Sequence, residues 1–329
     1  MKSRLKAFVV IVAYILWLPA QAAEIDLQKL VNEVHAQFAN ENSGKNPDYI
    51  PALAAVDSKL FAVSIVTADG KSYSAGDIKH EFSIQSVSKA FNLSAVMQQH
   101  GETAIVEKIG VNATGLPFSS IMAIELNEER SVNPLVNAGA IAQVSLLEAK
   151  NANKKWQMIE SNLELFAGRD LSVMKDIYKS ETDTNTKNQA IARLLANYGR
   201  LYGDIEESVD LYTRMCSVGV NTHDLAVMGA TYANSGKNPV TGKTVVEAKY
   251  VPKLLAVMAT AGLYDDSGLW LYKVGLPAKS GVGGGIVAVV PGKYGIAAFS
   301  PPVDAAGNSV RAQLAIEEIA KRLNANVFQ

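Results

Sequence analysis

Strand patterns lie near both ends of this chain, and a long stretch of helical patterns separates them. The expected strands are 60–66, 71–75, 285–290 and 294–299. The dipeptides Asp69-Gly70 and Pro291-Gly292 are turn signals that join these strands in pairs. Between residues 86 and about 264 the apolar spacing is mostly helical, with no convincing strand. We therefore expect one antiparallel sheet built from both ends of the chain, with an inserted helical lobe.

Amphipathic patterns flank these strands. Residues 25–40 and 310–323 each carry an apolar stripe at helical spacing. We expect the last helix to cover one face of the sheet, which makes the fold class α/β (α+β), an antiparallel sheet flanked by helices. A further helix at 87–99 would begin where the sheet meets the helical lobe, about 86–264. Pockets form most often in clefts between lobes, so we expect a pocket at the start of that helix.

The first residues have the pattern of a secretory signal. Three basic residues precede an apolar run at 7–18 and a small-x-small site at 20–22. The apolar run is short for a membrane span and no comparable run follows it, although an uncleaved anchor is the alternative. We expect a signal peptide at 1–22 and one catalytic domain at 23–329, exported to the bacterial periplasm or secreted, with no stable membrane span after cleavage.

The composition argues against several classes of partner. The formal net charge is −1 and no basic patch is present, so neither nucleic acid nor a membrane surface is expected as a partner. The four histidines are scattered, and the one cysteine, Cys216, cannot form an internal disulfide. We therefore expect no metal and no cofactor, and we expect Cys216 to be a small buried core residue.

Ser86 and Lys89 are the residues that point most directly to chemistry. They lie three positions apart at the start of the expected helix, so they share one face, where the helix N-terminus favours developing negative charge. Burial and this positive helix end disfavour an ammonium, so a neutral Lys89 could accept the proton of the Ser86 hydroxyl. The spacing alone is a weak signal, because it also occurs at 3–6 and 172–175.

A glycine-rich segment at 279–285 accompanies this pair. Its glycines precede the strand at 285–290 and no helix, which argues against a phosphate-binding loop. Glycines on a strand beside a cleft let backbone N–H groups approach a substrate, and such an N–H could be the second donor of an oxyanion hole. A β-bulge explains the glycines equally well when they are considered alone.

Two polar segments supply further candidates. Residues 133–140 lead from asparagines into small residues that allow close backbone approach, or they form a helix-start loop with asparagine caps. Glu181 and Asn188 lie seven positions apart, which places them on one face if the segment is helical. A solvated polar face explains this spacing equally well.

Together these motifs resemble a known family. Ser86, Lys89 and the Lys-Ser-Gly at 279–281 are similar to the serine-lysine acyl-transfer fold of β-lactamases and penicillin-binding proteins. More specifically, the whole set resembles the serine-dependent glutaminases. The segments of that set are 48–51, 85–89, 133–140, 212–217, 262–264 and 279–285, in order along essentially the whole mature chain. The resemblance implies hydrolysis of the side-chain amide of L-glutamine to L-glutamate and ammonia, without metal or cofactor, by a homo-oligomer (dimer or tetramer).

The resemblance also implies a role for each site residue. Ser86 would be the nucleophile and Lys89 its general base. Tyr49 and Tyr264 would lie near the reacting amide, with Tyr264 as the relay that protonates the leaving ammonia. The residues that would hold the amino-acid end of glutamine are Asn137, Glu181, Asn188 and Tyr212. The backbone of Val282 would be the second oxyanion donor.

Two other functions stay open on the residues. A periplasmic serine β-lactamase or DD-peptidase would also be exported and would use Ser-x-x-Lys with a Lys-Ser-Gly strand, but it leaves Asn137, Tyr212 and Tyr264 without a role. A non-catalytic exported amino-acid-binding protein would keep the pocket, but the presence of Ser86, Lys89 and Tyr264 argues against lost chemistry.

Overall fold

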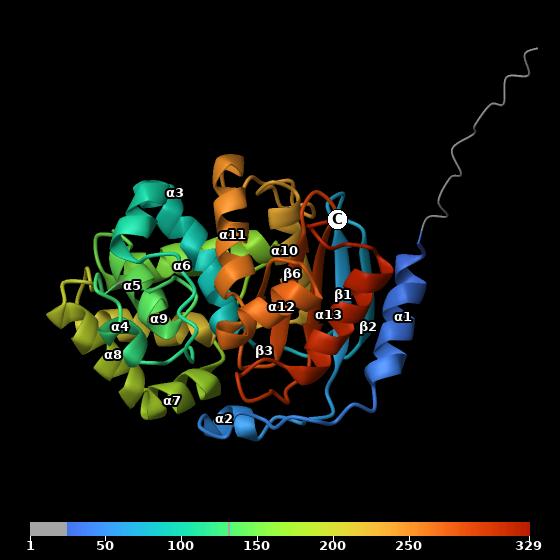
Figure 1. Cartoon of the computed structure of the whole chain (residues 1–329), viewed down its shortest axis with the longest axis horizontal. Coiled ribbons are helices and arrows are strands. Elements are labelled where there is room, and N and C mark those ends of the chain that lie inside the picture. The colour runs from blue at the N-terminus through green and yellow to red at the C-terminus, as the bar shows by residue number, and fades with distance from the viewer. Residues whose placement is uncertain (1–24, 131) are drawn as a thin grey trace, which may run out of the picture.

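The computed structural model describes residues 25–130 and 132–329 (Figure 1). The signal peptide expected at 1–22 lies outside these residues. None of the helices in the described ranges has both the length and the apolar character needed to cross a bilayer.

Five strands of the described residues form one antiparallel sheet in the order β2-β1-β7-β6-β5. They are β1 (Ala62–Thr67), β2 (Ser72–Gly76), β5 (Ala278–Ser280), β6 (Gly285–Val290) and β7 (Tyr294–Phe299). β1 pairs with β7, with Ile65 opposite Ile296, so strands from the two ends of the chain meet at the centre of the sheet. The antiparallel sheet expected from both ends is confirmed. β5 is an additional edge strand, too short to show a pattern in the sequence.

Both faces of this sheet are buried. Side chains alternate along a strand, and in β6 Ile286 and Ala288 contact one apolar cluster while Val287 and Val289 contact another. The helices α1 (Leu27–Phe38) and α13 (Val310–Arg322) cover the first face, as expected for the last helix (Figure 1). α10 (Thr222–Ala233) packs on the opposite face.

The segment between β2 and β5 forms the helical lobe, in which α3 to α9 lie on the left in Figure 1 and α10 and α11 lie at the centre beside the sheet. Its longer helices are α3 (Ser88–Lys108), α5 (Asn137–Leu146), α6 (Ala152–Ala167), α7 (Lys175–Thr184), α8 (Thr186–Asn197), α9 (Ile205–Cys216), α10 and α11 (Val251–Ala261). Shorter helical segments of the chain are α2 (Pro51–Ala54), η1 (Gln85–Val87), α4 (Met122–Glu125), η2 (Ala248–Tyr250), η3 (Tyr264–Asp266) and α12 (Ser267–Lys273). Phe91, Phe166 and Tyr232 pack together in this lobe, with ring centroids between 4.8 and 5.4 Å apart.

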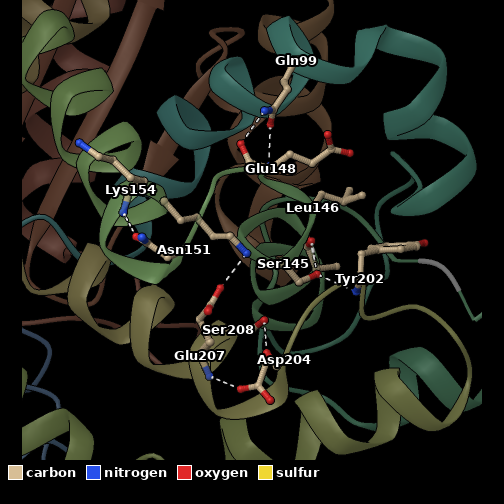
Figure 2. A network of polar contacts seen from close by, with 12 residues as sticks. Gln99, Ser145, Leu146, Glu148, Asn151, Lys154, Tyr202, Asp204, Glu207 and Ser208 are labelled. Carbon is tan, nitrogen blue, oxygen red and sulfur yellow. Dashed lines mark hydrogen bonds and ion pairs between the residues drawn. The ribbon is translucent and has the colours of Figure 1, made fainter.

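Polar contacts join the helices of this lobe (Figure 2). Gln99 of α3 exchanges two hydrogen bonds with the backbone of Glu148, at 2.9 and 3.0 Å. The Ser145 hydroxyl of α5 accepts from the Tyr202 N–H at 3.1 Å, just before α9. Asp204 then caps the first turn of α9 with its side chain. These contacts set the position of α9 relative to α3 and α5, and α3, α5 and α9 all contribute to the site described below.

A short ribbon corrects one expectation for the stretch 86–264, which the sequence predicts to lack strands. β4 (Gly219–Val220) pairs with β3 (Phe82–Ser83) in an antiparallel ribbon. Two residues are too few to display the alternation by which a strand is recognised in a sequence. The ribbon matters because β3 ends immediately before η1.

The helix expected at 87–99 is α3, which begins at Ser88. Its regular geometry breaks at Gly101, where φ is 80° and ψ is 168°, and helical turns then resume as far as Lys108. A glycine adopts this left-handed φ without the clash that a Cβ atom would cause. The helical pattern in the sequence therefore stops near the real break, and the second part of α3 was not anticipated.

Candidate active site

Ser86 lies in the η1 turn between β3 and α3. The Ile84 N–H donates to the Val218 carbonyl at 2.8 Å, which ties this turn to the β4 side of the ribbon. Gln85 has a φ of 49°, a left-handed conformation that costs a non-glycine residue about 1–3 kcal/mol. The Ser88 hydroxyl donates to the Gln85 carbonyl at 2.6 Å and stabilises this conformation. A strained and buried backbone therefore presents Ser86 at the start of α3.

Lys89 is fully buried at the start of α3, three residues after Ser86. Its Nζ donates to Asn137 Oδ1 at 2.7 Å and lies 5.5 Å from the centroid of the Tyr212 ring. Burial lowers the pKa of Lys89 to about 8, although Cys216 and Glu181 act in the opposite direction. The structure thus places an easily deprotonated amine one helical turn from the Ser86 hydroxyl.

Tyr264 borders the same site from η3. Its backbone is left-handed, with a φ of 58°, and its side chain is buried. The phenolic hydroxyl donates to the Ser280 carbonyl at 3.3 Å and interacts with the Ser86 side chain. Burial raises the pKa of Tyr264, so the phenol keeps its proton and can donate it to a group bound beside Ser86.

A cavity of about 340 Å³ opens beside these groups. Its lining includes Tyr49, Phe118, Asn137, Glu181 and Asn188. Asn137, the first residue of α5, donates to Asn188 Oδ1 at 2.9 Å. Asn137 Oδ1 accepts from the Tyr212 hydroxyl at 3.1 Å as well as from Lys89. One asparagine therefore links the buried lysine to the polar wall of the cavity.

Glu181 and Asn188 reach the cavity in a different way from the one that their spacing predicts. They do not lie on one continuous helix, because α7 ends at Thr184 and α8 begins at Thr186. Threonine and asparagine side chains compete with the backbone for hydrogen bonds, and the Thr184 hydroxyl bonds back to the Ser180 carbonyl at 2.9 Å. The break at Asn185 turns the chain, and both residues still line the cavity.

Glu181 is held by a residue to which the sequence analysis gave no role. Gln85 Nε2 donates to Glu181 Oε1 at 2.5 Å. Burial raises the pKa of Glu181 to about 7, against the opposing effects of Gln85, Lys89 and Ser217. A glutamine next to the nucleophile candidate carries no chemical pattern of its own, so only its left-handed backbone and this contact reveal its function.

The glycine-rich turn between β5 and β6 positions Val282. A Cβ atom on Gly281 would lie 2.9 Å from the Ile84 carbonyl, and one on Gly283 would lie 2.6 Å from the Ser83 carbonyl. Glycine is therefore needed for approach to the chain's own backbone before Ser86, whereas the sequence predicts either approach to a substrate or a β-bulge at these glycines. They lie in the turn after β5, where Val282 follows Gly281 directly.

Tyr49 and Phe118 border the cavity from loops. Tyr49 precedes α2 and is 53% exposed, so it lies at the mouth of the cavity rather than deep inside. Phe118 was not a candidate, yet its ring centroid lies 4.7 Å from that of Tyr264. Apolar loop residues give no signal in a sequence when their contacts come from elsewhere in the fold.

No metal site accompanies these groups in the described ranges, where no three His, Cys, Asp or Glu side chains come together in a way that could hold an ion. Cys216 is buried as expected, and burial raises its pKa to about 12. It is not remote from the site, however, because it interacts with the Tyr212 and Ser88 hydroxyls. The thiol is therefore a protonated, buried neighbour of Tyr212 and Ser88.

Serine-dependent enzymes of the β-lactamase-like type combine an antiparallel sheet with a helical insertion. A serine and a lysine one helical turn apart lie at the start of that insertion. The sequence model of the family described as Glutaminase matches residues 44–328 of this chain. This chain therefore belongs to the glutaminase family and is an amidohydrolase, as the resemblance of its motifs implied.

Relatives and solved structures agree with this assignment. A glutaminase of Colwellia psychrerythraea is 57% identical over 92% of this chain and 97% of its own length. Glutaminase 1 of Escherichia coli is 50% identical over 92% of this chain and 98% of its own. A solved structure described as probable glutaminase ybaS matches with a TM-score of 0.91 at 50% identity, covering 92% of this chain and 98% of that one.

Proposed function

We propose that this chain hydrolyses the side-chain amide of L-glutamine to L-glutamate and ammonia through an acyl-enzyme on Ser86. The observation that carries the proposal is the fully buried Lys89, three residues after Ser86, with a pKa that burial lowers to about 8. A lysine in this state releases its proton close to neutral pH and can act as a general base. Membership of the glutaminase family supports the choice of substrate.

The cavity would hold the amino-acid end of glutamine. Glu181 would accept the substrate α-ammonium, a charge-assisted contact that contributes about 1.5–3 kcal/mol when it is shielded from water. The α-carboxylate would be held by Asn137, Asn188 and Tyr212, which are already joined by hydrogen bonds. Gln85 would keep the Glu181 carboxylate oriented, through the bond at 2.5 Å.

Acylation would begin when Lys89 takes the Ser86 proton and Ser86 Oγ attacks the amide carbon. The backbone N–H groups of Ser86 and Val282 would stabilise the oxyanion, where the loss of one donor costs about 10²–10³ in rate. In the described ranges the Val282 N–H donates to no other backbone group, so it is available for this bond.

Release of ammonia would follow as the carbon–nitrogen bond breaks. Tyr264 would pass its proton to the leaving nitrogen and regain one from Lys89, so the acyl-enzyme forms with both groups restored. Water would then attack the ester with Lys89 again as base, which releases glutamate and returns the proton to Ser86. Each step uses groups already present in the site.

We expect glutamine to be hydrolysed with a kcat/KM at least about tenfold above that of asparagine. The asparagine amide is one methylene nearer to its α-carbon, and a methylene is worth about 1–3 kcal/mol in a fitted pocket. Once the amino-acid end is bound by Glu181 and the asparagines, the shorter amide cannot reach Ser86 in the same geometry. Ammonia release from purified protein, with glutamine, asparagine and γ-glutamyl peptides as substrates, measures this preference.

The same assay separates the alternatives. Equal rates on the two amides would contradict the specificity, and glutamine binding by calorimetry without ammonia release would favour the binding protein. Hydrolysis of a chromogenic cephalosporin instead of glutamine would favour the β-lactamase.

We further propose that residues 1–22 are a cleaved signal peptide and that the mature chain is periplasmic. The basic start, the apolar run and the small residues at 20–22 support this. When the full chain is expressed in a bacterium, we expect the protein to fractionate with the periplasm and to begin at Ala23 by mass spectrometry. Ala22→Phe should block cleavage. A cytoplasmic protein that keeps Met1 would contradict the proposal. A homo-oligomeric assembly stays a prediction from the family resemblance.

A further inference from the structure

Lys279 is a second fully buried lysine in this site, and the mechanism above does not use it. It lies in β5, and its Nζ donates to the Gly262 carbonyl at 2.8 Å and to the Ser280 carbonyl at 2.6 Å. The same nitrogen lies 4.1 Å from the centroid of the Tyr264 ring. Two carbonyl oxygens and the face of an aromatic ring therefore surround the Lys279 amine.

These neighbours are suited to an ammonium rather than to a neutral amine. Carbonyl oxygens only accept hydrogen bonds, and the face of a tyrosine ring carries negative electrostatic potential. Three protons of an ammonium can be directed at the three neighbours, whereas the lone pair of a neutral amine would be directed at one of them. The short contacts are typical of charge-assisted hydrogen bonds.

Lys89 is held differently. Among the described residues its one hydrogen-bond acceptor is Asn137 Oδ1, which also accepts from the Tyr212 hydroxyl. Glu181 and Cys216 act to raise the pKa of Lys89, so these neighbours alone would favour an ammonium at Lys89. A general base must be free of its proton, and a positive charge close to Lys89 would counter Glu181.

The two lysines act on each other. Burial lowers the pKa of Lys279, and the charge of Lys89 lowers it further. Because such repulsion is mutual, the pair favours one proton rather than two, and the lysine with more acceptors keeps it. The other ionisable groups around the two lysines are Cys216 and Tyr212 of α9, Glu181 of α7 and Tyr264 of η3.

We propose that Lys279 is a positioning residue whose ammonium is a fixed positive charge beside Ser86 and Lys89, and that this charge keeps the Lys89 amine unprotonated and ready to act as a base. The inference rests on the proposed function, because it explains how the general base of that reaction is kept in its active form. Lys279 itself would not touch the substrate.

The pH dependence of kcat/KM for glutamine tests this inference in Lys279→Met and Lys279→Arg. For the unsubstituted chain, the acid limb should have its midpoint near the Lys89 pKa of about 8. Lys279→Met removes the charge, so the pKa of Lys89 rises and the limb should move to higher pH by about one unit or more. Activity at pH 7 should fall about tenfold and return at higher pH. Lys279→Arg keeps the charge and should leave the limb in place, even if kcat is lower.

A matched control is Lys155→Met. Lys155 of α6 is also buried, but its charge is paired with Glu207 at 2.8 Å, so its loss should not move the limb. An unmoved limb in folded Lys279→Met would overturn the inference, while a uniform loss of activity at every pH would show a purely structural role. If the unsubstituted chain releases no ammonia from glutamine, the proposed function fails instead.

A second measurement decides the question without activity and without a folded Lys279→Met variant. The full chain with ¹⁵N-labelled lysine is examined by NMR at about pH 9, above the pKa of Lys89 of about 8. Signals are assigned with Lys89→Met and Lys279→Arg. We expect an ammonium signal from Lys279 and an amine signal from Lys89, and a neutral Lys279 at this pH would overturn the inference.

Discussion

Replacing Ser86 with alanine is expected to lower kcat for glutamine by about 10⁴–10⁶-fold, because no acyl-enzyme can form without the hydroxyl. The fold should remain intact. The substitution removes one hydroxyl, and the neighbouring Tyr264 hydroxyl keeps its bond to the Ser280 carbonyl at 3.3 Å. Ammonia release measures the loss, and circular dichroism during heating measures the fold.

The matched control for this variant is Ser94→Ala. Ser94 is a fully buried serine of α3, the helix that follows Ser86, and its hydroxyl donates to the Phe91 carbonyl at 2.6 Å, away from the cavity. We expect Ser94→Ala to keep most of its turnover. Ser86 would lose the role of nucleophile if its alanine variant retained activity within about tenfold of the unsubstituted chain, since binding changes alone are of that size.

Lys89→Met is expected to lower activity and to raise stability at the same time. Loss of the general base should cost about 10²–10⁴ in kcat. The substitution replaces a buried amine with an apolar chain of similar length, and Asn137 Oδ1 keeps the Tyr212 hydroxyl as a donor at 3.1 Å. The substitution leaves no buried acceptor unpaired. The variant therefore avoids the free-energy cost of burying the amine and loses no hydrogen bond that Asn137 needs.

The pH dependence of this gain has a definite sign. The pKa of Lys89 falls from 10.5 to about 8 on folding, so the unfolded chain binds more protons than the native one between these values. Stability contributed by Lys89 therefore rises with pH across this window and is lowest below it. The increase in melting temperature from Lys89→Met should be largest below pH 8 and should shrink toward pH 10.5.

Lys89→Arg is the control that separates a base from a cation. Arginine keeps the positive charge but stays protonated at any working pH, so it cannot accept the Ser86 proton and should be inactive. Activity in Lys89→Met comparable to that of the unsubstituted chain would remove Lys89 from the role of base. A melting temperature several degrees lower in Lys89→Met would show that the native amine stabilises the fold as a bound ammonium.

Most of the fold could be predicted from periodicity. The strands at 60–66 and 294–299 alternate or run apolar over enough residues to be recognised, and both belong to the one antiparallel sheet that was expected, although their direct pairing was not predicted. β3, β4 and β5 were not predicted, because strands of two or three residues are too short to show an alternating pattern. Their pairing depends on segments that are far away along the chain.

Some residues of the site could also be predicted from a local pattern, and others could not. Ser86 and Lys89 could be found because their spacing, three residues, is a local property of one helix turn. Gln85 and Phe118 could not be found in this way. Their roles depend on contacts with Glu181 and Tyr264, respectively, and no local pattern encodes those contacts. Lys279 was visible as part of a motif, but its partners were not.

The amino-acid sequence by itself determined the sheet from both ends, the helical insertion and the family to which the chain belongs, because these follow from periodicity and from ordered motifs. Only the tertiary structure decided which groups meet. It buried Lys89 against Asn137, held Glu181 with Gln85, and placed Lys279 over Tyr264. The physical reason is that burial sets the protonation of these groups, and burial is a property of the packed lobes rather than of any segment.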